Sequence, residues 1–405
     1  MTEGPRPRPT LRDIATALGL SVNTVSRALG DKDSVSASTR AAVQAEAARI
    51  GYVPNTLARS LVLGSAMTLG LVITNPSNPF YAQLISSIEL RVRAQGYSLL
   101  LLVTDESVEN EQRATEALLR SAVDGAVVVP VQAEWDHWRR VRDSGIPLVF
   151  VNRDVPELDC DMVGVDYERG SYEATSHLIA GGARSLLLLE EDLPITTTAD
   201  RISGFRRAMT DAGLPVADDL VRTVPTRRYD SLALPWQPEE AYRFAQSLDL
   251  PDGIVTGNDY FALGLLRVLA ERGLAVPDDV AITGYGDHPY AAYLQPPLTT
   301  VRLPAAEVGT TAVDLLLQRL KSGVERPRKT LIRPELVWSG RRRADAQHSP
   351  TSRTSRVRRP AERWLGRWGG VGEWLRSAYS SSQARTESLC SPNRGGGRLV
   401  SRAPA

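Results

Sequence analysis

The chain begins with a stretch in which apolar residues recur at helical spacing. Between residues 10 and 50 they stand three and four positions apart, a pattern that predicts three short helices. Thr10, Ser21 and Ser38 are placed to cap the starts of these helices. Gly51 is placed to end the third helix. Three helices in about 40 residues bury little surface, so we expect a small compact module.

A different pattern begins near residue 66, where short runs of valine, leucine and isoleucine alternate with helical segments. The runs span residues 68–74, 98–104, 125–131, 147–152, 162–166, 185–191, 253–259 and 280–287. The helical segments span residues 82–95, 109–121, 169–180, 202–212, 238–247 and 260–272. Because the runs are nearly continuous, both faces of each strand are expected to be covered, as in a parallel sheet. The pattern predicts a doubly wound α/β fold, and its length of roughly 275 residues favours two lobes.

After residue 340 the periodicity ends. Residues 341–405 hold 14 arginines and 4 acidic residues, together with glycines that oppose helix formation. We expect a basic, mostly disordered tail.

Charge is unevenly distributed along the chain, although its net charge is only +1. Residues 1–62 hold 8 basic and 5 acidic residues, so a basic N-terminal segment and the basic tail flank an acidic body. Basic ends indicate nucleic-acid binding only weakly, because solvated basic tails are common.

Composition excludes several classes of protein. A hydrophobic content of 42% and a charged content of 23% are typical of soluble globular proteins. No apolar run is long enough to span a membrane, and the N-terminus lacks the apolar core of a secretory signal. Cys160 and Cys390 cannot form a framework of disulfides. We therefore expect a cytoplasmic protein that does not contact a membrane.

Enzyme motifs are not found in the sequence. The four histidines, His137, His177, His288 and His348, show no metal-ligand spacing with cysteine or acidic residues. Neither a nucleophile elbow nor a P-loop nor a dinucleotide fingerprint stands at a strand-to-helix turn. We expect no metal, no cofactor and no enzymatic activity.

The predicted second helix has a face suited to DNA. Val25 lies on its apolar side, whereas Val22, Asn23, Ser26 and Arg27 occupy the opposite side of the helical wheel. This small polar face with one long cation fits a major groove. Arg27 can reach guanine edges or phosphate, Asn23 can reach adenine, and Val22 can contact a thymine methyl group. A merely solvated helix face is the alternative interpretation.

Residues 10–61 closely resemble the DNA-binding head of the lactose/galactose-repressor (LacI/GalR) family. The resemblance is carried by the motifs D-I-A, G-L-S-V-N-T-V-S-R-A-L, V-S-x-x-T-R and G-Y-x-P-N-x-x-A-R-S-L. It implies that a helix-turn-helix places Val22, Asn23, Ser26 and Arg27 where the family reads bases in the major groove.

The resemblance also implies a hinge. Residues 54–61 would form a short helix that folds on the DNA, with Asn55, Arg59 and Leu61 as contacts. Leu61 falls where family members wedge an apolar side chain into a central base step of the minor groove. Such a wedge kinks the duplex, and a helix this short does not persist unbound.

The resemblance continues through about residue 340. It rests on SNPFYAQLISSIE (77–89), VNRD (151–154), RISGF (201–205), NDYFALG (258–264), DVAITGYGD (279–287) and PPLTTV (296–301). It implies the fold of periplasmic sugar-binding proteins, in which two Rossmann-like lobes are joined by three crossovers and the ligand lies in the cleft. The candidate effector-binding residues are Phe80, Arg153, Asp166, Arg201, Asn258 and Asp287. Ligands of open parallel sheets bind at the carboxyl ends of strands, and these motifs begin where apolar runs stop. Taken singly, each residue is as easily explained by surface ion pairing or loop capping.

One departure from the family pattern affects the ligand. Where family members place an aspartate that accepts ligand hydroxyls, this chain has Gly286 in the segment Gly284-Tyr285-Gly286-Asp287. Asp287 is the candidate substitute for that acceptor.

These interpretations divide the chain into a helix-turn-helix domain at 1–53, a hinge at 54–64, a two-lobed body at 65–340 and a tail at 341–405. They predict a transcriptional repressor that binds a palindromic operator in double-stranded DNA as a homodimer. Its effector is expected to be a sugar or a related polyhydroxylated compound. An activator, or a repressor whose effector acts as co-repressor, is the alternative within the class, and a solute-binding protein is a distant alternative.

Overall fold

The computed structural model of the protein describes residues 9–30, 35–52, 65–225, 238–322 and 326–340. The hinge predicted at 54–61, with Asn55, Arg59 and Leu61, and the tail predicted at 341–405 lie outside these ranges. No helix in the described ranges combines the length and the apolar character needed to cross a membrane.

The head consists of three helices, as the apolar spacing predicts. They are α1 (Leu11–Leu18), α2 (Val22–Leu29) and α3 (Ala37–Ile50). The Asp13 carboxylate accepts hydrogen bonds from the backbone nitrogen and hydroxyl of Thr10 at the start of α1. Ser21 caps α2, whereas the cap of α3 is Ser36 and not the expected Ser38, because the Ser36 hydroxyl accepts from the Thr39 nitrogen at 3.2 Å. The three helices share a buried core of Ile14, Ala15, Val25, Ala28, Val43 and Ala47.

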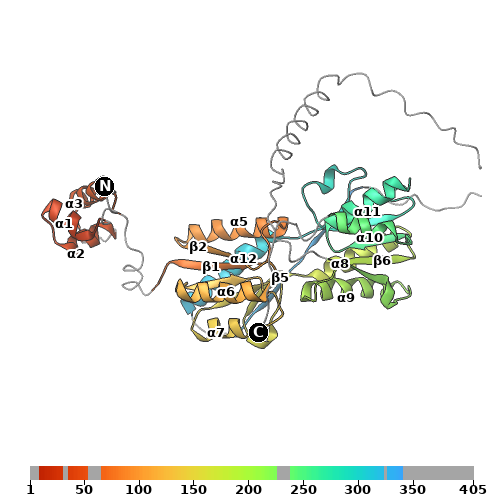
Figure 1. Ribbon diagram of the computed structural model, residues 1–405, viewed down its shortest axis with the longest axis horizontal. Helices are drawn as coiled ribbons and strands as arrows, with labels where there is room; N and C mark the ends of the chain where they lie inside the picture. The colour runs from red at the N-terminus through yellow and green to blue at the C-terminus, as the bar shows by residue number, and fades with distance from the viewer. Residues whose placement is uncertain (1–8, 31–34, 53–64, 226–237, 323–325, 341–405) are drawn as a thin grey trace, which may run out of the picture. The chain divides into compact units, whose positions relative to one another are not determined.

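The N-lobe of the body is built on a six-stranded parallel sheet, whose strands are orange and yellow in Figure 1 except for β11, which is blue. Its strand order is β11-β5-β4-β3-β1-β2. The strands are β1 (Thr68–Ile73), β2 (Ser98–Val103), β3 (Gly125–Val128), β4 (Leu148–Val151), β5 (Asp161–Val165) and β11 (Lys329–Ile332). Helices α5 (Pro79–Ala94) and α12 (Ala305–Ser322) pack against each other, as do α6 (Val108–Arg120) and α7 (Asp136–Asp143). The two helix pairs contribute to two separate apolar clusters, so both faces of the sheet are covered.

The C-lobe, drawn mainly in green, repeats this plan with strand order β12-β10-β9-β8-β6-β7 (Figure 1). Its strands are β6 (Leu186–Glu191), β7 (Val221–Val224), β8 (Gly253–Thr256), β9 (Ala281–Gly286), β10 (Thr299–Arg302) and β12 (Glu335–Val337). Its helices are α8 (Tyr167–Ala180), α9 (Thr196–Asp211), α10 (Pro238–Gln246) and α11 (Asp259–Glu271). Only the pair β10 and β12 is antiparallel among the described strand pairs of this sheet.

The chain passes between the lobes three times in the described ranges: after β5, after β10, and between β11 and β12. The prediction of two α/β lobes is therefore confirmed. The apolar pattern missed β7, β10, β11 and β12 and the helices α7 and α12. It was also wrong for β2, which lies at a sheet edge with half of its side chains exposed rather than covered on both faces.

Candidate DNA-reading helix and interlobe cleft

Helix α2 exposes the four residues that the sequence selects for base contacts. Val25 and Ala28 are fully buried against the other helices of the head, which fixes the orientation of α2. Asn23, Ser26 and Arg27 are exposed, and Val22 keeps 42% of its surface accessible although it is apolar. The face of α2 with Val25 and Ala28 is therefore held by packing, whereas the face with Asn23, Ser26 and Arg27 is exposed. Base reading by these residues stays a prediction.

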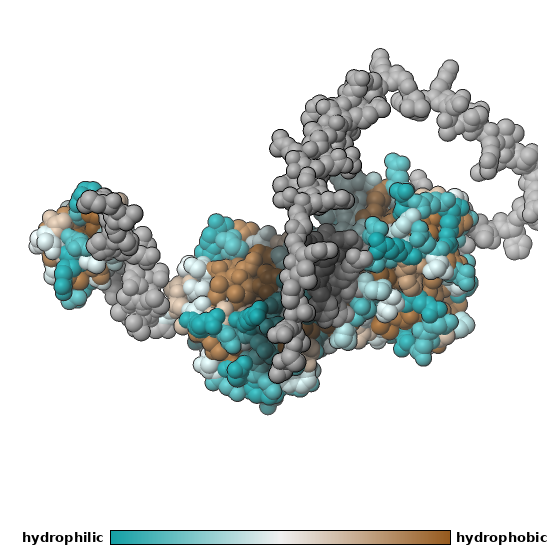
Figure 2. All heavy atoms as spheres, in the orientation of Figure 1, coloured by the Kyte–Doolittle hydropathy of each residue, from teal (hydrophilic) through white to brown (hydrophobic). Residues whose placement is uncertain are grey.

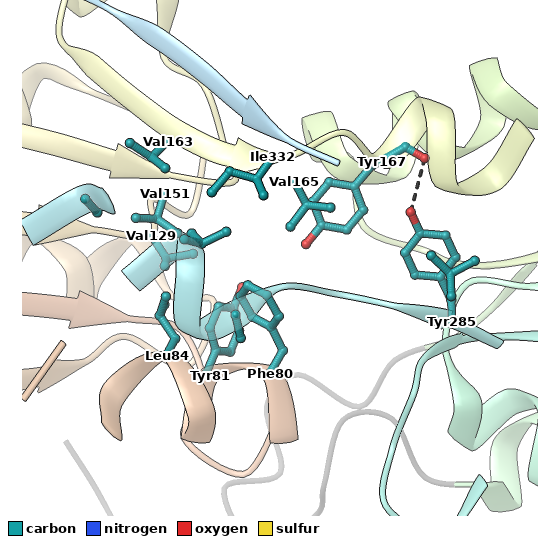
Figure 3. Packing of buried hydrophobic residues seen from close by; sticks show 14 of the residues in the cluster. Phe80, Tyr81, Leu84, Val129, Val151, Val163, Val165, Tyr167, Tyr285 and Ile332 are labelled. Carbon is teal, nitrogen blue, oxygen red and sulfur yellow. Dashed lines mark hydrogen bonds between the residues drawn. The ribbon is translucent and has the colours of Figure 1, made fainter. Parts of the chain in front are cut away.

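A cleft of about 560 Å³, open solvent included, lies between the two lobes of the body. Its wall is formed by Asn78, Phe80, Tyr81, Arg153, Tyr167, Glu191, Ile195, Thr197, Arg201, Gly257, Asn258, Tyr285, Gly286, His288 and Leu303. Most of these residues follow the carboxyl end of a strand, where parallel sheets bind ligands. Figure 3 shows Phe80 and Tyr81 at the N-lobe side of this region and Tyr167 with Tyr285 at the other.

Arg201 lines the cleft but points its guanidinium at a protein carboxylate. Its Nε and Nη2 atoms donate to the two carboxylate oxygens of Glu190 at 2.6 and 2.8 Å, and both side chains are buried. Burial works to lower the pKa of Arg201, but the charge and hydrogen bonds of Glu190 outweigh it and raise that pKa. Arg201 lies on α9, and Gly204 lets that helix approach α8 closely, because a Cβ at position 204 would overlap the carbonyl oxygen of Glu168. Arg201 is thus held rigidly at the cleft wall.

Arg153 is engaged in the same way on the N-lobe side. It donates to both carboxylate oxygens of Glu106 at 2.7 and 2.6 Å and to the carbonyl oxygen of Pro130 at 2.9 Å. Burial opposes the charged form, but Glu106 outweighs it and raises the pKa of Arg153. Each cleft arginine therefore has a carboxylate partner of its own.

Phe80 and Asn258 also reach the cleft. Phe80 packs edge-on against Tyr81, with ring centroids 5.5 Å apart. Asn258 caps α11 by accepting from the Phe261 nitrogen at 2.9 Å, and its Nδ2 atom lies 3.5 Å from Glu191 Oε1. The amide of Asn258 is therefore shared between a structural cap and the cleft wall.

Asp166 and Asp287 are not part of the cleft wall that the other four candidates line. The Asp166 carboxylate accepts from the Arg169 nitrogen at 3.0 Å and caps α8. The Asp287 carboxylate accepts from Arg302 Nε at 2.6 Å. Loop capping and surface ion pairing, the alternative explanations for single residues, thus account for the positions of these two carboxylates.

The wall contains groups that the sequence interpretation did not select, above all Tyr81, Glu191, Tyr285 and His288. A signal for Glu191 was present, since two glutamates at the end of a buried apolar run are costly unless they are paired. Nothing in the spacing marked the aromatic residues as different from core residues.

The backbone conformation at position 286 and a neighbouring histidine ring both favour glycine there. The φ of 132° at Gly286 disfavours any side chain, and a Cβ would lie 2.6 Å from Cε1 of His288. His288 is fixed in turn by Asp259, whose Oδ2 accepts from the His288 backbone nitrogen at 2.7 Å. Burial raises the pKa of Asp259 and lowers the pKa of His288. The place of the expected hydroxyl acceptor is therefore occupied by a histidine ring.

Comparison with known proteins agrees with this architecture. Residues 10–55 match the family "Bacterial regulatory proteins, lacI family", and residues 175–340 match the "Periplasmic binding protein-like domain". The HTH-type transcriptional repressor PurR of Haemophilus influenzae (strain PittEE) is 31% identical over 336 residues, which cover 81% of this chain and 97% of the relative. The PurR repressor of Vibrio parahaemolyticus is 31% identical over 333 residues, with the same coverage.

This chain belongs to the LacI family. Its fold matches the crystal structure of the Lac repressor dimer bound to operator and the anti-inducer ONPF, with a TM-score of 0.72, 25% identity and coverage of 82% of this chain and 98% of that one. It also matches the complex of the transcriptional regulator CelR with cellobiose, with a TM-score of 0.60, 27% identity and coverage of 82% and 99%.

Membership in the LacI family settles the class of function. The chain is a DNA-binding transcriptional repressor of this family and not an enzyme. The match over residues 10–55 also separates it from solute-binding proteins, whose two-lobed fold it shares.

Proposed function

We propose that this LacI-family protein binds a palindromic operator as a homodimer in the cytoplasm and that a small hydroxylated molecule in the interlobe cleft changes its operator affinity. Operator binding is supported by the exposed face of α2, which is formed by Val22, Asn23, Ser26 and Arg27 and lies opposite the buried face of the helix. We propose further that the domains end at residues 53, 64 and 340. The hinge between residues 54 and 64 would contact the operator through Asn55, Arg59 and Leu61.

Arg27→Ala should weaken binding to the operator by about 1–3 kcal/mol, because it removes a contact to a base edge or a phosphate. It should also relax the preference at one base position in each half-site. Fluorescence anisotropy with operator DNA selected from a random pool measures both effects. Arg49→Ala is the matched control, since Arg49 is an exposed arginine of the same head that pairs with Glu46. Operator affinity that is indifferent to Arg27→Ala would remove α2 from the interface.

The effector part of the proposal rests on the cleft and on contacts that cross it. Gln132 of the N-lobe and Thr196 of the C-lobe exchange hydrogen bonds, with the Thr196 nitrogen 3.0 Å from Gln132 Oε1. A ligand between the lobes competes with or reinforces such contacts, and so biases the lobe arrangement. A preference of about 1–3 kcal/mol for one arrangement gives a 5- to 150-fold change in operator affinity. Solved structures of similar regulators hold cellobiose, ribose and ONPG, and these complexes support a hydroxylated ligand.

The homodimer part rests on an apolar surface of the N-lobe. Leu90 on α5 and Leu101 and Val103 on β2 expose 57%, 40% and 36% of their surface, and these two elements pack together. Figure 2 shows apolar atoms gathered on the N-lobe where α5 and β2 run in Figure 1. Strand β2 lies at the edge of its sheet. An exposed apolar patch at a sheet edge favours association with a partner, and we propose a second copy of this chain.

A further inference from the structure

The side chain of His288, which forms part of the cleft wall, is held from behind by a carboxylate. The Oδ2 atom of Asp259 accepts from the His288 backbone nitrogen at 2.7 Å and lies 3.1 Å from Nδ1 of the ring. The Oδ1 atom of Asp259 accepts from the Thr300 hydroxyl at 2.6 Å. Asp259 is fully buried at the start of α11, so the imidazole is anchored to the frame of the C-lobe.

The packing around the imidazole of His288 leaves it little freedom to turn. Tyr260 packs edge-on against it with ring centroids 4.9 Å apart, and the ring of Tyr290 lies 5.6 Å from it on a tilted plane. Strand β9 makes room for its anchor, because a Cβ at Gly284 would overlap Oδ1 of Asp259. The orientation of the imidazole is therefore fixed by neighbours on several sides.

The hydrogen bonds around Asp259 determine which ring nitrogen of His288 carries the proton. The backbone nitrogen of Asp287 donates to the Thr300 hydroxyl oxygen at 3.2 Å, so the proton of that hydroxyl is left for Asp259. Both oxygens of Asp259 then act as acceptors, and Nδ1 of His288 is the donor to its carboxylate. Burial lowers the pKa of His288 despite the carboxylates of Asp259 and Asp287, so the ring is neutral at about pH 7. A neutral imidazole with its proton on Nδ1 has a lone pair on Nε2.

This lone pair has no donor from the protein. Among the residues that the structure describes, none forms a hydrogen bond with Nε2 of His288. An enclosed acceptor without a donor is costly, and a molecule in the cleft can supply one. The neighbouring residues offer no other acceptor, since Gly286 has no side chain and the Asp287 carboxylate accepts from Arg302 outside the wall. The imidazole is therefore the acceptor that this corner of the cleft offers.

We propose that Nε2 of His288 accepts a hydrogen bond from a hydroxyl group of the effector and thereby selects ligands that have a donor at that position. This inference rests on the proposed function, since it assigns one contact of the molecule that occupies the same cleft. Asp259 is a positioning residue, because it acts on the ligand only through the ring. A carboxylate, an ether oxygen or a fluorine at that position presents lone pairs alone, and Nε2 rejects it.

The test uses common neutral hexoses and pentoses together with cellobiose. For each sugar that binds, a set of analogues replaces one hydroxyl at a time by fluorine, which is polar and small but cannot donate. Calorimetric titration into the full-length protein measures each affinity. Fluorine at the hydroxyl that His288 binds should weaken binding about tenfold, as expected for the loss of one hydrogen bond.

Two substitutions separate the contact with the ligand from the anchoring of the ring. His288→Asn keeps an amide nitrogen near the place of Nδ1, so it can still donate to Asp259, but it has no atom at the place of Nε2. It should weaken binding of the parent sugar about tenfold, and the fluorine at the selected position should then cost nothing more. His288→Gln carries its amide near the place of Nε2 and should recover part of the affinity.

His177→Asn is the matched control, because His177 belongs to the same lobe, on α8, but lies outside the cleft wall. It should leave every affinity and the pattern of fluorine effects unchanged. Thermal unfolding of each variant checks that it is folded. Losses from fluorine and from His288→Asn that add at every hydroxyl position, unchanged affinity in His288→Asn, or binding by no sugar of the panel would each overturn the inference.

The protonation of the ring can be measured without a ligand. Nitrogen NMR of protein that carries isotopically labelled histidine, with the His288 signals identified by their loss in His288→Asn, should find the proton on Nδ1 at about pH 7. A proton on Nε2, or on both nitrogens, would contradict the role of this ring as an acceptor.

Operator titration in the presence of each binding sugar separates this inference from the proposed function. A sugar that binds wild type and His288→Asn equally well, and changes operator affinity in both, supports the proposed function and overturns the inference. A sugar that binds through His288 without changing operator affinity supports the inference and contradicts the effector part of the proposed function.

Discussion

Arg201→Ala is expected to destabilise the body by about 3–5 kcal/mol, because it leaves the carboxylate of Glu190 buried without its cation. Glu190 is fully buried, and both of its carboxylate oxygens accept hydrogen bonds from Arg201. Chemical denaturation followed by fluorescence measures the free energy of unfolding. The resemblance to LacI-family members assigns this arginine to the ligand, but the structure gives its guanidinium a second role inside the wall.

Two further variants identify the cause of the loss. The double variant Arg201→Met with Glu190→Met should recover most of the stability, because it removes the unpaired charge along with its partner. Arg113→Ala should cost less than about 1 kcal/mol, since Arg113 and Glu109 form an exposed pair. Equal losses for Arg201→Ala and Arg113→Ala would contradict the assignment of a buried ion pair.

Leu101→Glu should convert the protein to a monomer and weaken binding to a palindromic operator by about 10²- to 10⁴-fold. A carboxylate on the apolar surface around Leu90, Leu101 and Val103 would have to be desolvated when a second copy docks. A monomer then engages one half-site at a time and loses the advantage of two linked heads. Analytical ultracentrifugation and operator anisotropy measure the two consequences.

Val216→Glu is the matched control for this substitution. Val216 is also an exposed apolar residue, with 41% of its surface accessible, but it belongs to the C-lobe and not to this patch. It should leave both mass and operator affinity unchanged. A Leu101→Glu protein that sediments as a dimer would show that the copies meet elsewhere.

The sequence predicts the elements whose apolar pattern is strong and misses those whose pattern is mixed. The runs that form β1, β3 and β4 are apolar along most of their length, and each is an inner strand of its sheet. Strands β7 and β10, with the sequences VRTV and TTVR, mix apolar and polar residues without a regular period and are only four residues long, so neither stands out. Their pairing depends on neighbours that are distant in the sequence.

The location of the candidate cleft was predictable from the sequence, but the ion pairs in its wall were not. Phe80, Arg153, Arg201 and Asn258 follow the ends of strands, and parallel sheets bring such ends together. The partners of the arginines could not be predicted in this way, because Glu106 and Arg153 stand 47 residues apart and meet only through the fold. A local contact decides the role of Asp166, which caps a helix that begins at the next residue.

We propose above all that this LacI-family protein reads DNA through two symmetric copies of its head. Selection of bound sequences from a random DNA pool by the full-length protein, followed by sequencing, tests it most directly. Two symmetric heads should enrich a two-fold symmetric sequence whose half-site centres lie about 10 base pairs, one helical turn, apart. Enrichment of no sequence, or of a single asymmetric half-site, would contradict it.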